Sequence, residues 1–176
     1  MFEIAIPDPS LVVLIGAAGA GKSTFAARHF GPSEVLSSDV YRALISGDAA
    51  DQTVTRAAFG RLHRDLGRRL DGRLLSVVDA TNVDRGARQA LLRRAANAGL
   101  PAVAIVLDLP AEVVLARNAA RPERIVAEAA VWHHLAQLRG TLDQPRRPLE
   151  TEGFSLVIVL RDPREVDLVS IVRQTG

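Results

Sequence analysis

The chain has 176 residues, 48% of them hydrophobic, which suffices for one well-buried core and favours a single domain over residues 1–176. No apolar run approaches the roughly 20 residues of a membrane-spanning helix, the N-terminal residues do not fit a targeting leader, and no cysteine is present for disulfides or thiolate chemistry, so we expect a soluble, cytoplasmic protein without membrane contacts. The net charge of +2 is too small to indicate nucleic-acid binding by itself.

Short apolar runs rich in valine, isoleucine and leucine alternate with segments of helical periodicity. This alternation is typical of a parallel sheet covered by helices on both faces. The sequence therefore predicts an α/β fold with a mainly parallel central sheet of four or five strands. The expected strands span residues 11–15, 34–37, 74–79, 102–108 and 154–160.

Helices are expected between these strands. The clearest one begins after Asp84, a favourable N-cap residue, and ends at Asn97, before a glycine and a proline. A second is expected over residues 53–70, where leucines and alanines form an apolar stripe, and a third opens at Pro110. Residues 140–153 are expected to form a loop. A final helix is expected from Pro163, carrying Val166, Leu168, Val169, Ile171 and Val172.

A glycine-rich segment joins the first predicted strand to the helix after it. Its sequence, Gly16-Ala17-Ala18-Gly19-Ala20-Gly21-Lys22-Ser23, fits the P-loop pattern, in which backbone N–H groups curl around phosphates. Lys22, the one lysine of the chain, would reach the β- and γ-phosphate oxygens, and Ser23 would bind Mg²⁺ or Mn²⁺. We therefore predict nucleoside triphosphate (NTP) binding, with ATP or GTP as donor. The predicted NTP-binding residues are Gly16, Gly19, Ala20, Gly21, Lys22, Ser23 and Thr24, together with the arginines Arg117 and Arg121.

Asp39 directly follows the second predicted strand, and ligands of open α/β sheets bind beyond the carboxyl ends of the strands. Its carboxylate is a candidate general base that deprotonates an attacking hydroxyl, and Arg42, one helical turn later, is a candidate for holding an anionic acceptor. The alternative is that Asp39 simply caps a helix beginning at Val40.

Asp79 ends another predicted strand and is followed by Thr81 and Asn82. Asp79 resembles a Walker B acid. It would either help Ser23 to hold the metal through a water molecule or orient the neighbouring loops, and Asp39 is a second candidate for a water-mediated metal contact. All three residues are candidates for contacting the acceptor. The alternative is a plain turn before the helix that Asp84 caps.

Arg117 and Arg121 are expected to share one helix face, because they are four positions apart. On a helical lid that closes over the γ-phosphate, both would neutralise the charge that develops during transfer. The alternative is a solvated basic face.

Taken together, these motifs resemble the 5′-kinase domain of bacterial polynucleotide kinase-phosphatase. The resemblance rests on Leu-Ser-Ser-Asp at 36–39, Asp-Gln-Thr-Val-Thr at 51–55, Val-Val-Asp-Ala-Thr-Asn-Val at 77–83 and Ala-Arg-Asn-Ala-Ala-Arg at 116–121. It implies transfer of the γ-phosphate to the 5′-hydroxyl of DNA or RNA, as in nucleic-acid end healing. It also implies that Asp39 is the general base, that Arg42 contacts the acceptor and that Arg117 and Arg121 act from the lid. It further implies a homodimer, and phosphatase and ligase modules in a longer chain.

Two other functions remain open from the residues. A small-metabolite or nucleoside kinase would share the P-loop and the lid, and a non-catalytic module would use NTP binding only to switch a surface. The resemblance is weaker over residues 127–153, where Trp132 is expected in the core and the adjacent His133 and His134 at the surface. No residue pattern specifies the preferred NTP or the choice between DNA and RNA.

Overall fold

The computed structural model describes residues 2–121, 125–143 and 148–175, and its centre is a five-stranded, fully parallel sheet. The strand order is β3-β4-β2-β5-β6, so β2, which leads into the P-loop, lies in the middle. This arrangement confirms the predicted α/β fold. The strands are β2 (Leu11–Ile15), β3 (Val35–Ser37), β4 (Ser76–Asp79), β5 (Ala102–Leu107) and β6 (Leu156–Leu160).

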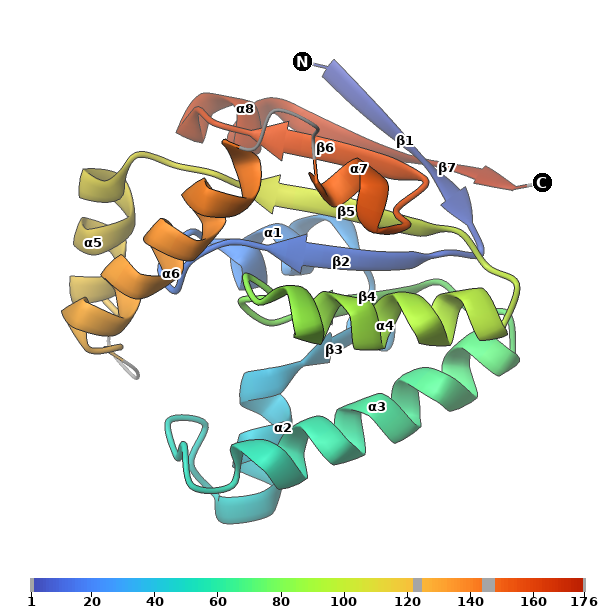
Figure 1. The fold of residues 1–176 in the computed structure, drawn as a ribbon, viewed down its shortest axis with the longest axis horizontal. Coiled ribbons are helices and arrows are strands. Elements are labelled where there is room, and N and C mark those ends of the chain that lie inside the picture. The colour runs from blue at the N-terminus through green and yellow to red at the C-terminus, as the bar shows by residue number, and fades with distance from the viewer. Residues whose placement is uncertain (1, 122–124, 144–147, 176) are drawn as a thin grey trace.

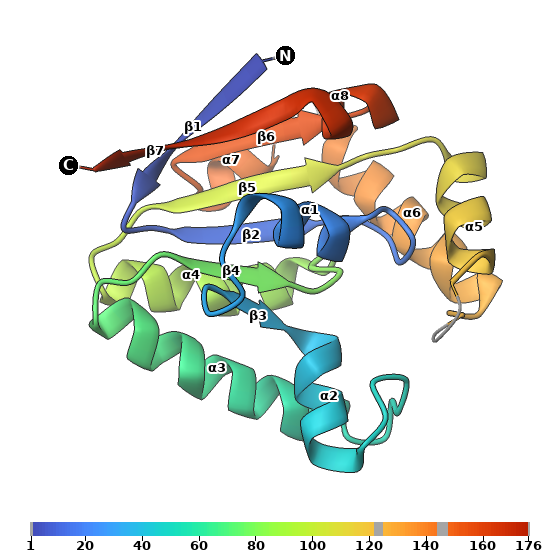
Figure 2. The same ribbon diagram turned by 180° about the vertical axis from the view of Figure 1, so that it is seen from behind.

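Helices cover both faces of this sheet (Figures 1 and 2). One face carries α1 (Lys22–His29) and α8 (Pro163–Leu168), and the other carries α3 (Thr55–Asp71), α4 (Arg85–Asn97) and the short α7 (Pro148–Glu152). The helix α2 (Ser38–Ser46) follows β3 at the sheet edge. Beyond the carboxyl ends of β2 and β5 lie α5 (Ala111–Ala119) and α6 (Glu128–Leu142), in the place expected for a lid.

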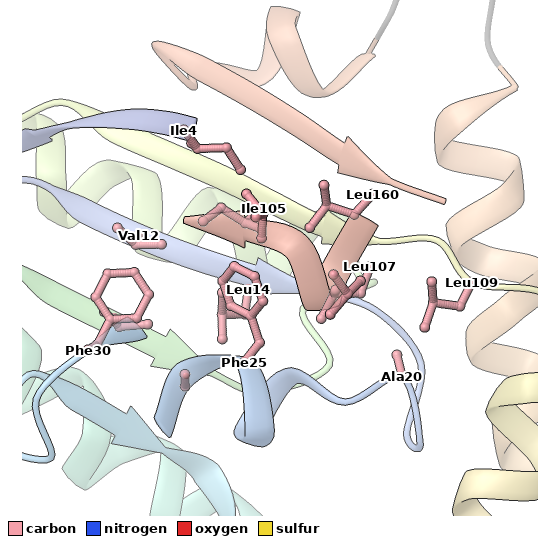
Figure 3. Close-up of a cluster of buried hydrophobic side chains, with 14 of the residues drawn as sticks. Ile4, Val12, Leu14, Ala20, Phe25, Phe30, Ile105, Leu107, Leu109 and Leu160 are labelled. Carbon is pink, nitrogen blue, oxygen red and sulfur yellow. The ribbon is translucent and has the colours of Figure 1, made fainter. Parts of the chain in front are cut away.

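The central strand divides the core into two clusters, because successive side chains of a strand point to opposite faces. Val12 and Leu14 pack with Phe25 of α1 and Ile105 of β5 on one face, as Figure 3 shows. Leu11, Val13 and Ile15 pack on the other face with leucines of α3 and α4. All five residues of β2 are fully buried, which fixes the start of the P-loop rigidly.

The predicted helices over 53–70 and 84–97 are confirmed as α3 and α4. Asp84 caps α4, since its carboxylate accepts a hydrogen bond from the backbone N–H of Ala87 at 2.9 Å. The third predicted helix, opening at Pro110, is confirmed as α5, whose N-cap residue is Pro110.

Two sequence predictions at the C-terminal end are wrong. The expected loop over 140–153 is partly helical, because α6 continues to Leu142 and α7 occupies residues 148–152; residues 144–147 lie outside the described ranges. The expected final helix ends at Leu168. The next residues form β7 (Val169–Thr175), which pairs in parallel with β1 (Phe2–Asp8), a strand that the sequence analysis did not predict. Pairing between two distant segments outweighed the local apolar pattern here.

None of the helices in the described ranges is both long enough and apolar enough to cross a lipid bilayer.

Candidate active site

The P-loop connects β2 to α1, and its shape requires glycine at Gly19. Gly19 and Gly21 have φ angles of +91° and +94°, in the left-handed region that side chains disfavour. A Cβ atom on Gly19 would lie 2.5 Å from the backbone oxygen of Val114, so the lid helix α5 approaches this turn closely. Lys22 curls back over the loop, and its ammonium group donates to the carbonyl oxygens of Gly16 at 2.9 Å and Ala17 at 2.8 Å.

Ser23 and Asp79 meet beside the loop. The Ser23 hydroxyl donates to the Oδ2 atom of Asp79 at 2.7 Å, although the two residues are 56 positions apart. One hydroxyl and one carboxylate suit Mg²⁺, which prefers oxygen ligands and keeps phosphate oxygens and water for its other positions. Among the described residues there is no group of three or more His, Cys, Asp or Glu side chains that could hold a metal.

Asp39 and Arg42 form an ion pair on the first turns of α2. The helix begins at Ser38 rather than at Val40, and Ser37 occupies the N-cap position, so the alternative of Asp39 as a plain cap is wrong. The side chain of Arg42 is only 6% exposed, and its Nε atom donates to the carbonyl oxygen of Ala49 at 2.9 Å. The guanidinium is thereby held in one place beside the carboxylate of Asp39.

A cavity of about 470 Å³ brings together seven of the predicted site residues. It is bordered by the P-loop, the end of β4, the first turns of α2 and α3, and the lid. The predicted residues that line it are Lys22, Ser23, Asp39, Arg42, Asp79, Thr81 and Arg121. Further lining residues, which the sequence analysis did not single out, include Gln52, Thr55, Phe59, Ile125, Val126 and Ala130.

Asn82 and Arg117, two of the predicted residues that do not line this cavity, have other surroundings. Asn82 is 4% exposed and has φ +50°, and its side-chain amide donates to the carbonyl oxygen of Leu14 at 2.7 Å. It holds the β4–α4 loop against β2 and does not line the cavity. Arg117 lines a separate hollow of about 240 Å³, together with Gly21, Thr24, Phe25, Arg28, Val166 and Asp167. The two lid arginines therefore line different cavities.

In the segment 127–153, where the family resemblance is weaker, the side chains of Trp132 and His134 lie in other places than the sequence predicts. Trp132 is 48% exposed and lines a surface cleft with Leu109 and Arg139, so the prediction of a core tryptophan is wrong. Its indole N–H donates to Glu128 at 3.2 Å, one helical turn earlier. His133 is exposed as predicted, but His134 is partly buried and lines the P-loop cavity. Residues on one helix point in different directions according to their spacing, and here that separates the two histidines.

Tyr41 fixes α2 against α3. Its hydroxyl donates to the Oδ2 atom of Asp65 at 2.8 Å. Burial and this hydrogen bond raise the pKa of Tyr41 to about 12, so the phenol stays protonated and remains a donor at neutral pH. The contact stabilises the helix that presents Asp39 and Arg42 to the cavity.

Comparisons with known proteins agree with the fold described above. The family model described as an AAA domain, AAA_33, matches residues 11–145. Among solved structures, the Pnkp1/Rnl/Hen1 RNA repair complex contains a chain that is 26% identical, with a TM-score of 0.66; the match covers 77% of this chain and 46% of that one, so this chain spans about half the length of that relative.

Two further structures show the same fold at lower identity. Shikimate kinase from Acinetobacter baumannii is 22% identical, with 91% and 88% of the two chains covered and a TM-score of 0.54. Kti12 from Chaetomium thermophilum, solved with ADP-AlF3, is 20% identical, with 89% and 93% covered and a TM-score of 0.60. Sequence comparison with curated proteins found no match. The matched family, the P-loop and the parallel sheet together show that the chain belongs to the AAA_33 family and has the P-loop kinase fold.

Proposed function

We propose that this protein transfers the γ-phosphate of an NTP to the 5′-hydroxyl end of a polynucleotide. One observation carries the proposal: the Asp39–Arg42 pair of α2 lines the same cavity as Lys22 and Ser23 of the P-loop. A module that only binds NTP needs the P-loop, but it does not need a carboxylate and a guanidinium in the same cavity. Phosphoryl transfer does, since an acceptor hydroxyl must be positioned and deprotonated.

The donor phosphates would lie along the P-loop. Its backbone N–H groups and the N-terminus of α1 attract anions, and Lys22 would release its carbonyl contacts to reach the β- and γ-phosphates. Ser23 and Asp79 would hold Mg²⁺, directly or through water, where the metal neutralises charge on the transferred group. The nucleoside end would extend into the hollow lined by Thr24, Arg28 and Arg117.

The acceptor would enter from the α2 side. Asp39 would accept the proton of the 5′-hydroxyl, and its pairing with Arg42 keeps the carboxylate oriented. Arg42, locked by Ala49, would bind the first phosphate of the strand. Arg121 faces the cavity from the lid segment and would stabilise the negative charge on the transferred phosphoryl group.

Two lines support a polynucleotide as the acceptor. One is the set of motifs shared with bacterial polynucleotide kinases; the other is the 26% identity to a chain from an RNA repair complex. A homodimer and linked phosphatase and ligase modules belong to the same proposal. A small-metabolite kinase is the second candidate, because a cavity of about 470 Å³ is large enough for one sugar-sized acceptor.

A transfer assay with matched acceptors tests the proposal. The protein is incubated with Mg²⁺ and γ-labelled ATP or GTP in the presence of a 5′-hydroxyl oligonucleotide of DNA or RNA, the same strand carrying a 5′-phosphate, or shikimate or gluconate. We expect label on the 5′-hydroxyl strand and none on the phosphorylated strand. Label on a small acceptor alone would assign the metabolite function, and NTP binding without transfer to any acceptor would support the non-catalytic one.

A further inference from the structure

A fully buried ion pair lies directly behind the β4–α4 loop. Arg88 of α4 and Glu152 of α7 have side chains that are each 1% exposed. Two parallel hydrogen bonds join them, from Nε to Oε2 at 2.8 Å and from Nη2 to Oε1 at 2.7 Å. The remaining Nη1 atom of Arg88 donates to the carbonyl oxygens of Asn82 at 3.0 Å and Val83 at 2.7 Å.

The loop that Arg88 holds is also bound to the P-loop. On its other side, the carbonyl oxygen of Thr81 accepts from the backbone N–H of Gly16 at 3.0 Å, and the Asn82 side chain donates to Leu14 at 2.7 Å. The loop is thus clamped between the start of the P-loop and the guanidinium of Arg88. Asp79, Ala80 and Thr81, just before the clamp, form the wall of the catalytic cavity.

Stability alone does not explain a pair of this kind. Removing two charges from water is costly, and well-packed apolar residues of similar volume often stabilise a core equally well or better. Apolar side chains cannot donate to the carbonyl oxygens of Asn82 and Val83, however, which would then be buried without partners. The arginine thus does what an apolar residue cannot do: it fixes the path of a loop whose Asn82 has a left-handed backbone.

We propose that Arg88, locked by Glu152, is a positioning residue that holds Asp79 and Thr81 in the geometry needed for metal binding and transfer. It acts through the carbonyl oxygens of Asn82 and Val83 and touches neither substrate nor metal. The kinetic part of this proposal rests on the proposed function. The structural part, that the pair holds the loop against the P-loop, stands independently of it.

The double variant Arg88→Met, Glu152→Leu separates positioning from stability, because it removes both charges together and keeps the volume. Relief from burying two charges offsets the loss of the hydrogen bonds to the carbonyl oxygens of Asn82 and Val83, so we expect a folded variant whose urea-denaturation midpoint is close to that of the wild type. The amide of Gly16, bonded to Thr81, should exchange hydrogen at least about tenfold faster. In the transfer assay kcat should fall about tenfold and the Mg²⁺ requirement should rise, with NTP affinity changed less than about threefold.

Arg69→Met is the matched control. Arg69 also donates to backbone beside β4, at 2.7 Å to the carbonyl oxygen of Leu75, but at the end of the strand far from the cavity. It should lower stability without changing Gly16 exchange or kcat. Arg88→Lys, which keeps the charge and part of the donor set, should recover part of the lost rate.

Wild-type Gly16 exchange in the double variant would overturn the proposal whatever the enzyme's activity. Wild-type kcat and Mg²⁺ dependence in a folded double variant would overturn its kinetic part. If the wild type also fails to transfer phosphate, the proposed function is contradicted instead. Hydrogen exchange at the Gly16 amide would still test whether the Arg88–Glu152 pair holds the loop.

Discussion

Arg42 and Asp39 form an ion pair across one turn of α2, and Arg42 is nearly buried whereas Asp39 remains about one-third exposed to the cavity. The burial of Arg42 comes from its neighbours, including the carbonyl oxygen of Ala49 that accepts from Nε. The carboxylate is thus held by a fixed cation while it lines the same cavity as Lys22 and Ser23 of the P-loop. A general base that must meet an incoming hydroxyl requires this combination of orientation and access.

Arg42→Ala should reduce kcat/KM for the acceptor by about 10²-fold, because the anionic strand and Asp39 both lose their fixed partner. Arg42→Lys should recover only part of the loss, since a single ammonium group cannot bind Asp39 and the carbonyl oxygen of Ala49 at the same time as the planar guanidinium does. Steady-state kinetics with a 5′-hydroxyl oligonucleotide give the measurement, and NTP affinity should stay within about twofold of the wild type in both variants. Unchanged acceptor kinetics in Arg42→Ala would remove Arg42 from the site.

Ser23→Ala should raise the Mg²⁺ concentration needed for half-maximal rate and lower the rate at saturation by at least about tenfold, because the hydroxyl beside Asp79 is lost. Ser23→Thr keeps the hydroxyl and serves as the control, with a Mg²⁺ titration close to that of the wild type. If both variants have the same Mg²⁺ dependence, the hydroxyl is not a metal ligand.

Gly19→Ala should abolish NTP binding and destabilise the fold, because the new Cβ would lie 2.5 Å from the backbone oxygen of Val114 in addition to the strain of φ +91°. Gly47→Ala is the matched control: its φ is +79°, but a Cβ there meets no atom within 4 Å, so only backbone strain of about 1–2 kcal/mol is expected. Urea denaturation and nucleotide titration distinguish the two. Wild-type NTP affinity in Gly19→Ala, or an equal loss of affinity in Gly47→Ala, would contradict the explanation by the close contact with Val114.

His63 should make the fold less stable in mild acid. Burial, followed by the charge of Arg94, lowers the pKa of His63 below 6.5, and its ring accepts a hydrogen bond from Arg94 at 3.2 Å. The folded state therefore takes up its proton at lower pH than the unfolded state does. The contribution of neutral His63 to the stability of the fold is complete above pH 6.5, the pKa of histidine in the unfolded chain. It is lost as the pH falls through the lower pKa of His63 in the folded state.

Denaturation at pH 7 and pH 5 measures this effect. His63→Gln, which keeps an acceptor for Arg94, should show a smaller loss of stability between the two pH values than the wild type. His133→Gln, at an exposed position, is the control and should lose stability as the wild type does. An equal loss in His63→Gln would exclude His63 as a source of the pH dependence.

The sequence was sufficient for the central strands and the P-loop, because buried parallel strands and phosphate-binding turns have strong local signals. It was insufficient for β1 and β7. Ile4 and Ile6 alternate with more exposed residues, which is the pattern of a half-buried strand, but the pattern is short and the pairing strand lies at the other end of the chain. Val169, Ile171 and Val172 fit both a helix stripe and a strand, and only pairing with the other end of the chain decides between them.

Within the candidate site, the sequence identified the residue types that bind phosphate, but residue spacing did not predict which cavity each side chain reaches. Arg117 and Arg121 share a helix face by spacing, but α5 ends at Ala119, so the second arginine leaves the helix and reaches a different cavity. The Arg88–Glu152 clamp has no local signal at all, because its partners are 64 residues apart and meet only through the fold. From the sequence alone, Asn82 is as good a candidate for binding the phosphoryl acceptor as for a structural role. Its hydrogen bond to the carbonyl oxygen of Leu14 shows the structural role.

The most direct test of the central claim is phosphoryl transfer by Asp39→Asn, a variant that keeps the shape of the side chain and removes its basicity. Transfer to a 5′-hydroxyl oligonucleotide is compared with the wild type at saturating NTP, and NTP affinity is measured in parallel. We predict a loss of about 10²- to 10⁴-fold in kcat with NTP affinity nearly unchanged. Transfer at the wild-type rate would contradict the assignment of Asp39 as general base and with it the proposed mechanism.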